Sequence, residues 1–184
     1  QNLIRNMMTN ILITGCSSGI GLETALFVNK QNIKVYASAR DENDVKMLQS
    51  LGLKAFKIDV TKKEEITFAL NEILKEDNKL DCVFNNAGFA IPGAIEDIET
   101  EVLKELFDTN FFGLHEVTIQ AMKIFRAQGY GKIIQHSSVL GIISLRFRGA
   151  YNASKYAIEG LCDTLRPETL NSNIFISTIN TGPV

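Results

Sequence analysis

The chain has 184 residues, of which 45% are hydrophobic and 22% are charged, and its formal net charge at pH 7 is −2. This is an ordinary composition for a globular protein, and a chain of this length can bury roughly two thirds of its unfolded surface. The 19 basic and 21 acidic residues are interspersed, which argues against a nucleic-acid-binding surface or a polybasic membrane patch. No apolar run approaches the roughly 20 residues of a membrane span, so we predict a cytoplasmic protein.

Residues 9–184 are predicted to form one domain, because the sequence has no linker, no low-complexity tract and no repeat beyond alternating strand and helix patterns. Residues 1–8 have no clear periodicity, and we expect an artificial or disordered start there. Cys16, Cys82 and Cys162 are widely spaced and odd in number, so neither a disulfide framework nor a metal site is predicted.

A glycine-rich loop lies between the first predicted strand, residues 10–14, and a helical pattern over residues 19–28. Glycines let the backbone turn tightly and approach a ligand, and the N-terminus of the following helix attracts phosphate. The spacing is GxxxGxG instead of the GxGxxG of the longer dinucleotide fingerprint, and a turn without a ligand is the alternative. The strand before the loop and the helix after it favour a cofactor site formed by Gly15, Cys16, Ser17, Ser18, Gly19, Ile20 and Gly21.

The end of the second predicted strand, residues 34–38, indicates which dinucleotide would bind. A carboxylate that binds the ribose of NAD is expected about 20 residues beyond the glycine loop, whereas an arginine accommodates the 2′-phosphate of NADP. Ser38 and Arg40 occupy this place, and the acid is missing. Asp41 and Glu42 follow, but they can equally begin the next helix, where acids suit the helix dipole. The sequence therefore favours NADP over NAD.

Two more strand and helix units follow. A third strand, residues 54–58, ends in Asp59 and Val60, and residues 61–64 have a capping-box pattern that opens a helix through about residue 75. Asp59 alone is as consistent with a turn as with a ligand contact. A fourth strand, residues 81–85, precedes small residues that allow close approach of backbone or ligand, namely Asn86, Ala87 and Gly88.

The repeated order of strand and helix predicts an α/β fold with a parallel sheet covered on both faces. A long helical pattern over residues 100–128 contains Asn110 among aromatic residues. An unsatisfied buried amide costs about 1–3 kcal/mol, so Asn110 is expected either to find partners or to bend or open the helix. Residues 132–138 form a fifth strand that ends in Ser137 and Ser138, and residues 173–179 form a sixth.

Tyr151 and Lys155 stand four residues apart in a predicted helix, residues 149–170, in which Pro167 should kink or break the chain. Residues at this spacing share one helix face. A tyrosine with a pKa near ~10 is a poor base at neutral pH, but a fixed cation beside it favours the phenolate. The pair therefore indicates acid/base chemistry, although the same pattern also arises by chance on solvated helices.

With these residues in place, the chain from residue 10 to 184 resembles the short-chain dehydrogenases/reductases, in the branch of ordinary length. The resemblance rests on the order and intervals of five motifs: TGxxxGIG at residues 14–21, NNAG at residues 85–88, Asn110, Ser138, and Tyr151 with Lys155. It implies a Rossmann-type, doubly wound parallel sheet in three α/β/α layers. Family members normally have roughly 250 residues, so the resemblance also implies that a C-terminal part with a last strand and a substrate loop is missing.

The resemblance assigns roles that spacing alone could not. It implies catalysis by Asn110, Ser138, Tyr151 and Lys155, in which Tyr151 donates a proton to the developing alkoxide and Ser138 orients the same oxygen. The charge of Lys155, together with that of oxidised nicotinamide, would lower the pKa of Tyr151. Lys155 would also hold the nicotinamide ribose, and Asn110 would position a water. Further cofactor contacts are implied for Asp59, Val60, Asn86, Gly88 and Val184.

The implied function is an NADP(H)-dependent oxidoreductase that interconverts a carbonyl and an alcohol, of the carbonyl reductase or hydroxysteroid dehydrogenase kind. The alternative is a catalytically silent NADP-binding redox sensor of the same fold, which is disfavoured because all four catalytic positions are kept. A homodimer or homotetramer without a metal is also implied. The sequence departs from the family at Thr181, where proline is usual, and at Arg146 and Pro167, whose roles the sequence does not reveal.

Overall fold

The computed structural model describes residues 10–182. The expectation for residues 1–8 and the cofactor contact of Val184 lie outside the described residues. Within them, six strands form one sheet in the order β3-β2-β1-β4-β5-β6, and every neighbouring pair is parallel. The strands are β1 Asn10–Ile13, β2 Lys34–Ala39, β3 Lys54–Lys57, β4 Cys82–Asn85, β5 Tyr130–Ser138 and β6 Asn173–Thr181.

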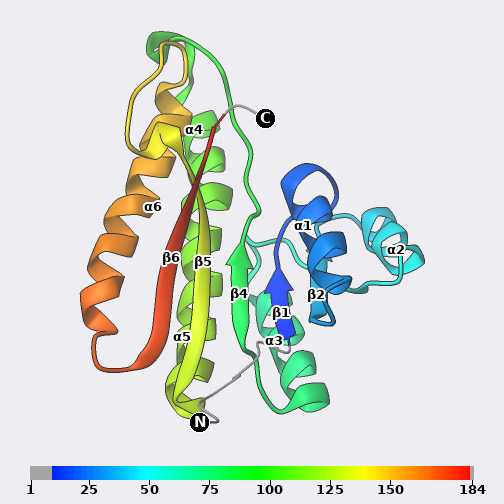
Figure 1. Cartoon of the computed structure of the whole chain (residues 1–184). Helices are drawn as coiled ribbons and strands as arrows, with labels where there is room; N and C mark the ends of the chain where they lie inside the picture. The colour runs from blue at the N-terminus through cyan, green and yellow to red at the C-terminus, as the bar shows by residue number, and fades with distance from the viewer. Residues whose placement is uncertain (1–9, 183–184) are drawn as a thin grey trace.

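Helices cover the sheet on both sides (Figure 1). One hydrophobic cluster joins the sheet to α3, α5 and α6, and a second joins the opposite face to α1 and α2. The helices are α1 Gly19–Asn29, α2 Glu42–Ser50, α3 Lys63–Asp77, α4 Thr100–Phe107, α5 Leu114–Gln128 and α6 Gly149–Glu168, with short 3₁₀ turns at Ile95–Asp97 and Val139–Gly141. The predicted doubly wound, three-layer α/β fold is confirmed.

Alternation along the central strands explains why both faces need helices. Ile11 and Ile13 of β1 pack in the cluster with α1 and α2, whereas Leu12 between them packs with α3 and α5. Side chains that alternate between two buried faces make the strand apolar throughout, which is typical of a parallel sheet. Strand order reverses between β1 and β4, and this switch point is where ligands bind in open α/β sheets.

The long helix predicted over residues 100–128 is interrupted at its centre. α4 ends at Phe107, a π-helical segment spans Asp108–Gly113, and α5 continues from Leu114. The segment contains Asn110, and the interruption agrees with one of the two alternatives considered for this residue, that it bends or opens the helix. π-helical turns of this kind occur frequently at functional sites.

The start of α3 differs from the prediction, and the end of α6 contains the proline. The capping box predicted at residues 61–64 is wrong: α3 has Lys62 as its N-cap residue, and the Thr61 hydroxyl donates to Asp59 at 2.7 Å instead. Pro167 lies in the last turn of α6, which ends one residue later at Glu168. It therefore ends the helix without kinking it in the middle.

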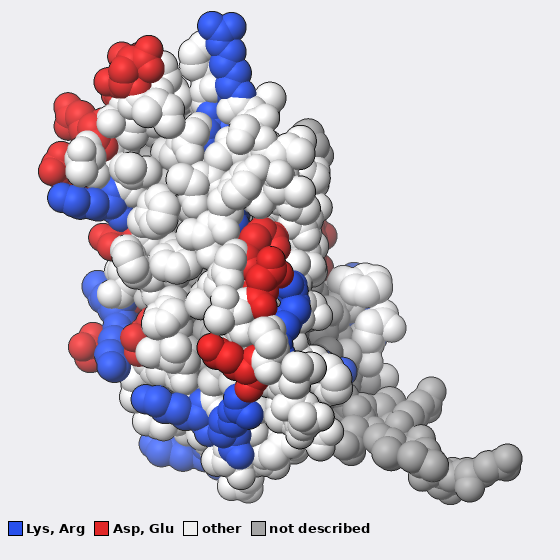
Figure 2. Space-filling view, turned by 90° about the vertical axis from the view of Figure 1, so that its left-hand side faces the viewer, with Lys and Arg blue, Asp and Glu red and all other residues white. Residues whose placement is uncertain are grey.

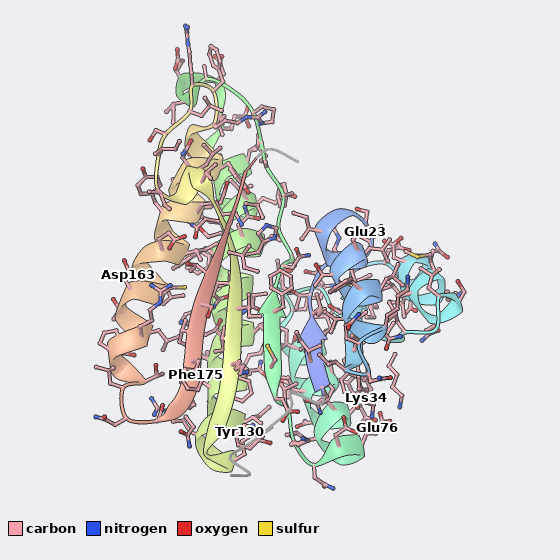
Figure 3. All side chains as sticks on the ribbon, viewed as in Figure 1. Glu23, Lys34, Glu76, Tyr130, Asp163 and Phe175 are labelled. Carbon is pink, nitrogen blue, oxygen red and sulfur yellow. The ribbon has the colours of Figure 1, made fainter. Side chains whose placement is uncertain are left out.

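Acidic and basic side chains both occur over the face shown in Figure 2, with uncharged surface between them. The helices of residues 10–182 include none that is long and apolar enough to cross a bilayer. β6 lies at the edge of the six-stranded sheet, and its Phe175 and Ile179 side chains are exposed by 60% and 42%. Phe175 is labelled on β6 in Figure 3.

Candidate active site

The glycine loop packs directly against the segment that follows β4. Gly15 has a φ of +68°, and a Cβ atom there would lie 2.7 Å from Cα of Ala87. Gly19 has a φ of +56° and no atom within 4 Å of its Cβ position, so the space beside it is open. The first glycine is therefore required by the close approach of two backbones, and the second leaves room at the start of α1.

A groove of about 470 Å³ lies at the carboxyl ends of the strands, beside the switch point. This volume is in the range of small-molecule sites. Most of the residues predicted to bind a cofactor line it: Gly15, Ser17, Ser18, Ile20, Gly21, Arg40, Asp59, Val60, Asn86, Ala87 and Gly88. The groove also contains residues that the sequence interpretation missed: Ile58, Phe89, Glu105, Thr109 and His136.

Two of the predicted cofactor residues are buried behind the groove. Cys16 is fully buried, its backbone N–H donates to the Ser38 carbonyl at 2.7 Å, and burial raises the pKa of its thiol to about 12. Ser38 is also fully buried, and its hydroxyl does not line the groove. Both residues connect the glycine loop to β2, so their side chains support the groove from behind.

The end of β2 presents a cation to the groove. Arg40 is exposed and lines the groove, and it lies near enough to Asp59 to favour the charged carboxylate. Burial would raise the pKa of Asp59, but hydrogen bonds from Thr61 and the cations Lys62 and Arg40 hold it below its usual value. Asp41 is the N-cap residue of α2 and accepts a hydrogen bond from the Asn43 backbone at 2.7 Å. Its carboxylate is therefore used in capping, as the alternative interpretation of the sequence allowed.

Tyr151 and Lys155 lie on the first two turns of α6, on the face toward β5. The Lys155 ammonium donates to the His136 carbonyl at 2.6 Å and lies 5.4 Å from the centre of the Tyr151 ring. Lys155 is 5% exposed, and burial lowers its pKa to about 8, an effect that Glu159 partly offsets. The ammonium of Lys155 is thus a poorly solvated cation beside a phenol.

Burial of its phenol determines the pKa of Tyr151 in this structure. Burial raises it above its usual value, and the neighbouring Ser138 hydroxyl offsets only part of this effect. Loss of hydration of the phenolate dominates in the described structure, and the lowering expected from Lys155 together with oxidised nicotinamide stays a prediction. Tyr151 therefore remains a proton donor at neutral pH.

Ser138 ends β5, and its side chain lies within reach of β6. Its hydroxyl donates to the Thr181 carbonyl at 3.3 Å and accepts from the Leu140 backbone at 3.1 Å, so it also caps the 3₁₀ turn that follows. Neither serine lines the groove, and Ser137, the alternative in the sequence, is fully buried. The structure therefore places Ser138, and not Ser137, beside Tyr151.

Asn110 is fully buried in the π-helical segment and uses both ends of its amide. Its Nδ2 donates to the Phe89 carbonyl at 2.8 Å and to the Ser154 hydroxyl at 3.2 Å, and its Oδ1 accepts from the Phe89 backbone at 3.0 Å. These contacts join the segment after Gly88 to α6 one residue before Lys155. Its proposed role in positioning a water stays a prediction.

His136 is the most informative of the residues that the sequence interpretation missed. Its ring lies between Asn86 and Thr181 at hydrogen-bonding distance from both, and burial and Lys155 lower its pKa to about 4. A signal was present in the sequence, because residues two apart on a strand share a face and Ser138 was already singled out. The spacing therefore places His136 on the same face of the strand as Ser138.

The residues present fit a nicotinamide dinucleotide. The open space at Gly19, the start of α1 and the exposed Arg40 suit phosphate groups, and the Asp59 carboxylate in the groove can accept hydrogen bonds. Among residues 10–182, no group of three or more His, Cys, Asp or Glu side chains is arranged to hold a metal ion. Sheet order, glycine loop and groove together define a Rossmann-type protein with a groove in the size range of small-molecule and cofactor sites.

Comparisons with known proteins agree with this assignment. A family model described as short chain dehydrogenase matches residues 9–184, and the chain belongs to this family. It is 42% identical over 179 residues to the uncharacterized oxidoreductase YbbO of Escherichia coli strain K12, covering 97% of this chain and 66% of that protein. It is 34% identical over 184 residues to human retinol dehydrogenase 8, covering 95% of this chain and 58% of that protein.

A solved structure entitled ElxO with NADP bound superimposes with a TM-score of 0.90 at 27% identity, covering 96% of this chain and 74% of that chain. The predicted family is therefore confirmed, and relatives with oxidoreductase names and an NADP-bound structural neighbour support a nicotinamide cofactor. The chain spans less than two thirds of the length of the two relatives named above.

Proposed function

We propose that this chain is the catalytic core of an NADP(H)-dependent oxidoreductase that interconverts a carbonyl and an alcohol. The observation that carries the proposal is the junction of the groove with Lys155, whose ammonium bonds to a groove residue and faces the Tyr151 ring. A buried cation beside a phenol and a serine hydroxyl, next to a groove in the size range of cofactor sites, suits proton transfer coupled to hydride transfer.

Tyr151 acts as the general acid in the reducing direction and donates its proton to the alkoxide oxygen that forms from the carbonyl. Its raised pKa suits this role, because the phenol keeps its proton at neutral pH. Ser138 orients the same oxygen by a hydrogen bond, and Lys155 stabilises negative charge that develops on Tyr151 as the proton leaves. Bound NADPH would supply the hydride.

In this proposal Asn110 acts indirectly, through the residues that its side chain holds. By holding Ser154 and the backbone of Phe89, it fixes the start of α6 against the segment that lines the groove. The four residues of the predicted catalytic set thus come from the π-helical segment, the end of β5 and α6. The side-chain amide of Asn110 holds the π-helical segment against α6 through the Ser154 hydroxyl.

Arg40 is assigned to the 2′-phosphate of NADP, because it is exposed in the groove while the carboxylate of Asp41 is engaged at the N-terminus of α2. We expect Arg40→Asp to reduce the preference for NADPH over NADH by about tenfold or more, since an ion pair is replaced by repulsion. Titration calorimetry with each cofactor measures this ratio. Lys46→Asp makes the same change of charge on α2 outside the groove and should leave the ratio unchanged.

The substrate is proposed to be an apolar, lipid-like carbonyl or alcohol. Ile142, Leu145 and Phe147 are all more than half exposed in the segment between β5 and α6, directly before Tyr151. The relationship to a protein named retinol dehydrogenase supports the same class of compound. Arg146 stacks on the Phe147 ring at 4.8 Å, so this arginine is part of the same surface.

The experiment that tests the function is NADPH oxidation by the natural full-length protein with a panel of aldehydes, ketones and steroid-like carbonyls. Tyr151→Phe serves as the matched variant, because it removes only the hydroxyl. We expect turnover of the wild type to fall at least about 100-fold in this variant, with NADPH affinity retained. Binding of NADPH without turnover of any compound would overturn the enzyme assignment and support the redox sensor.

The quaternary structure and the location remain part of the proposal. Phe112 of the π-helical segment and Tyr156 of α6 are exposed by 56% and 43%, which is consistent with helix surfaces that pair in a homodimer or homotetramer. Sedimentation of the full-length protein tests this assembly. A cytoplasmic location stays a prediction.

A further inference from the structure

His136 is held on both sides by side chains from neighbouring strands. It projects from β5, and its Nδ1 lies 2.9 Å from Oδ1 of Asn86, directly after β4. Its Nε2 lies 3.0 Å from the hydroxyl of Thr181, at the end of β6. The ring thus bridges three adjacent strands at the carboxyl end of the sheet, where the groove lies.

The neighbours of Asn86 determine which nitrogen of His136 carries the proton. The amide Nδ2 of Asn86 lies 2.9 Å from the Thr14 carbonyl and 2.8 Å from the Gly15 carbonyl, and carbonyls only accept hydrogen bonds. The NH₂ group of Asn86 must therefore face the glycine loop, and its oxygen must face His136. A neutral His136 then donates from Nδ1 to Asn86 and accepts from Thr181 at Nε2.

This chain of hydrogen bonds ends on the backbone that shapes the cofactor groove. Gly15 has a positive φ and begins the loop that lines the groove, and Asn86 is the side chain that holds its carbonyl. Without His136, the oxygen of Asn86 would lose its partner, and the amide could rotate away from the two carbonyls. The orientation of Asn86, and with it the loop, depends on the donor at Nδ1.

Thr181 completes the arrangement in a way that the usual residue at this position would not. A proline has neither a hydroxyl nor an N–H, so it could not donate to Nε2 of His136. Thr181 also offers its backbone carbonyl to the Ser138 hydroxyl at 3.3 Å. The pairing of His136 with Thr181 therefore joins the reactive end of the site to the glycine loop through one connected set of contacts.

We propose that His136 is a positioning residue, protonated on Nδ1, which orients Asn86 so that the glycine loop is held in the conformation that binds the dinucleotide. The inference rests on the proposed function only for the identity of the ligand. The His136 carbonyl that binds Lys155 belongs to the backbone and is kept in every variant of the side chain. Substitution of the ring therefore isolates its effect on the cofactor.

Two variants with an amide side chain separate the two hydrogen bonds of the His136 ring, the one to Asn86 and the one to Thr181. The side-chain amide of asparagine matches the position of Nδ1, and that of glutamine matches Nε2. His136→Asn keeps a donor to Asn86 and loses Thr181, whereas His136→Gln reaches Thr181 and loses Asn86. We expect His136→Gln to weaken NADP⁺ binding about tenfold and His136→Asn to stay within about twofold of the wild type, as expected for one buried hydrogen bond.

The measurement is titration calorimetry of the natural full-length protein with NADP⁺, without substrate, together with the unfolding temperature of each variant. A structural role alone would lower the unfolding temperature of both variants and affect binding alike. Adding Asn86→Ala to His136→Gln should cause no further loss if the ring acts through Asn86. Equal affinities of the two amide variants, or additive losses in the double variant, would overturn the inference.

The tautomer provides a readout that does not depend on the ligand. The sequence contains two histidines, so ¹⁵N shifts of the side-chain nitrogens can be assigned by comparison with a His136→Asn sample. We expect a protonated Nδ1 and an unprotonated Nε2 at neutral pH, and the reverse tautomer would overturn the inference. Binding of NADP⁺ without carbonyl turnover would refute the proposed function alone, whereas no binding by the wild type would refute both.

Discussion

The two ends of the sheet carry similar side chains in different arrangements. At the amino ends of the strands, Lys34 and Tyr36 meet Asp77, which accepts from them at 2.6 and 2.9 Å (Figure 3 labels Lys34 and the adjoining Glu76). At the carboxyl ends, Lys155 lies against the Tyr151 ring beside the groove. Within residues 10–182, Lys155 forms no ion pair with a carboxylate. The amino end of the sheet therefore pairs its lysine with carboxylates, whereas the carboxyl end leaves the Lys155 cation unpaired beside the groove, within residues 10–182.

Because only one of them is paired with carboxylates, the pKa values of Lys34 and Lys155 shift in opposite directions. Burial alone would lower the pKa of Lys34, but hydrogen bonds to Asp77 and Glu76 outweigh it and raise the pKa. Burial lowers the pKa of Lys155 to about 8, because its hydrogen-bonding partner is a carbonyl and Glu159 acts only at longer range. Paired charges at the amino end stabilise the fold, whereas the poorly compensated cation at the carboxyl end is suited to chemistry.

The largest expected effect separates the two lysines directly. Lys155→Met removes the cation that stabilises the ionised Tyr151, and we expect turnover to fall by about 10²- to 10⁴-fold, with weaker NADPH binding. Lys34→Met, the matched variant, should keep turnover and lower the free energy of unfolding by about 1 kcal/mol. Steady-state rates and urea unfolding of both variants test this contrast. Normal turnover in Lys155→Met would remove that residue from the mechanism.

Features that depend on local order could be predicted from the sequence. The strand, glycine loop and α1 follow one another directly, and Tyr151 and Lys155 share a face because four residues make about one helical turn. An interruption of the long helix was one alternative that followed from the polar Asn110 within an apolar pattern, although its π-helical form was not predicted. Repetition of the strand and helix units then led to the parallel sheet and to the groove at its carboxyl end.

Features that depend on contacts between distant segments could not be predicted. Asp77 meets Asn10 and Lys34 across 67 and 43 positions of sequence, and no local pattern marks such a pair. His136 lies between Asn86 and Thr181 only because β5 lies between β4 and β6. The raised pKa of Tyr151 was also missed, because burial can be judged only after the surrounding chain has been placed.

The pH dependence of reduction sharpens the description of the carboxyl end. Both Tyr151 and Lys155 act in their protonated forms, and the lower of the two pKa values, about 8, belongs to Lys155. We expect kcat/KM for reduction to be level between about pH 6 and 7.5 and to fall up to tenfold per unit above about pH 8. A profile that rises through this range would contradict the assigned protonation states.

Substitution of Glu159 should shift the pH dependence of kcat/KM while Tyr151, Ser138 and Lys155 are unchanged. Its carboxylate raises the pKa of Lys155, and its Oε1 accepts from Asn180 at 2.6 Å, a contact that glutamine can also accept. Glu159→Gln should therefore shift the fall in kcat/KM to lower pH. Asp163→Asn, at the next turn of α6, serves as the control and should leave the profile in place.

The smallest expected effect concerns stability at the amino end. Burial would raise the pKa of Asp77, but hydrogen bonds from Lys34, Asn10 and Tyr36 outweigh it and hold the pKa below its usual value. A carboxylate with a depressed pKa stabilises the fold above its unfolded pKa of about 3.9, and this contribution is lost as the pH falls toward the folded value. Asp77→Asn should therefore lower the free energy of unfolding by about 1–3 kcal/mol at pH 7, and by less at pH 3.

Urea unfolding at the two pH values measures this difference, with Asp163→Asn as the matched control. Asp163 pairs with Arg166 at 2.5 Å, but its side chain is 73% exposed, so its loss should change stability by less than about 0.5 kcal/mol. NADP⁺ affinity should be the same in both variants, since neither residue lines the groove. A loss of affinity in Asp77→Asn would show that the two ends of the sheet are coupled, and that the separation between structural and reactive charges is incomplete.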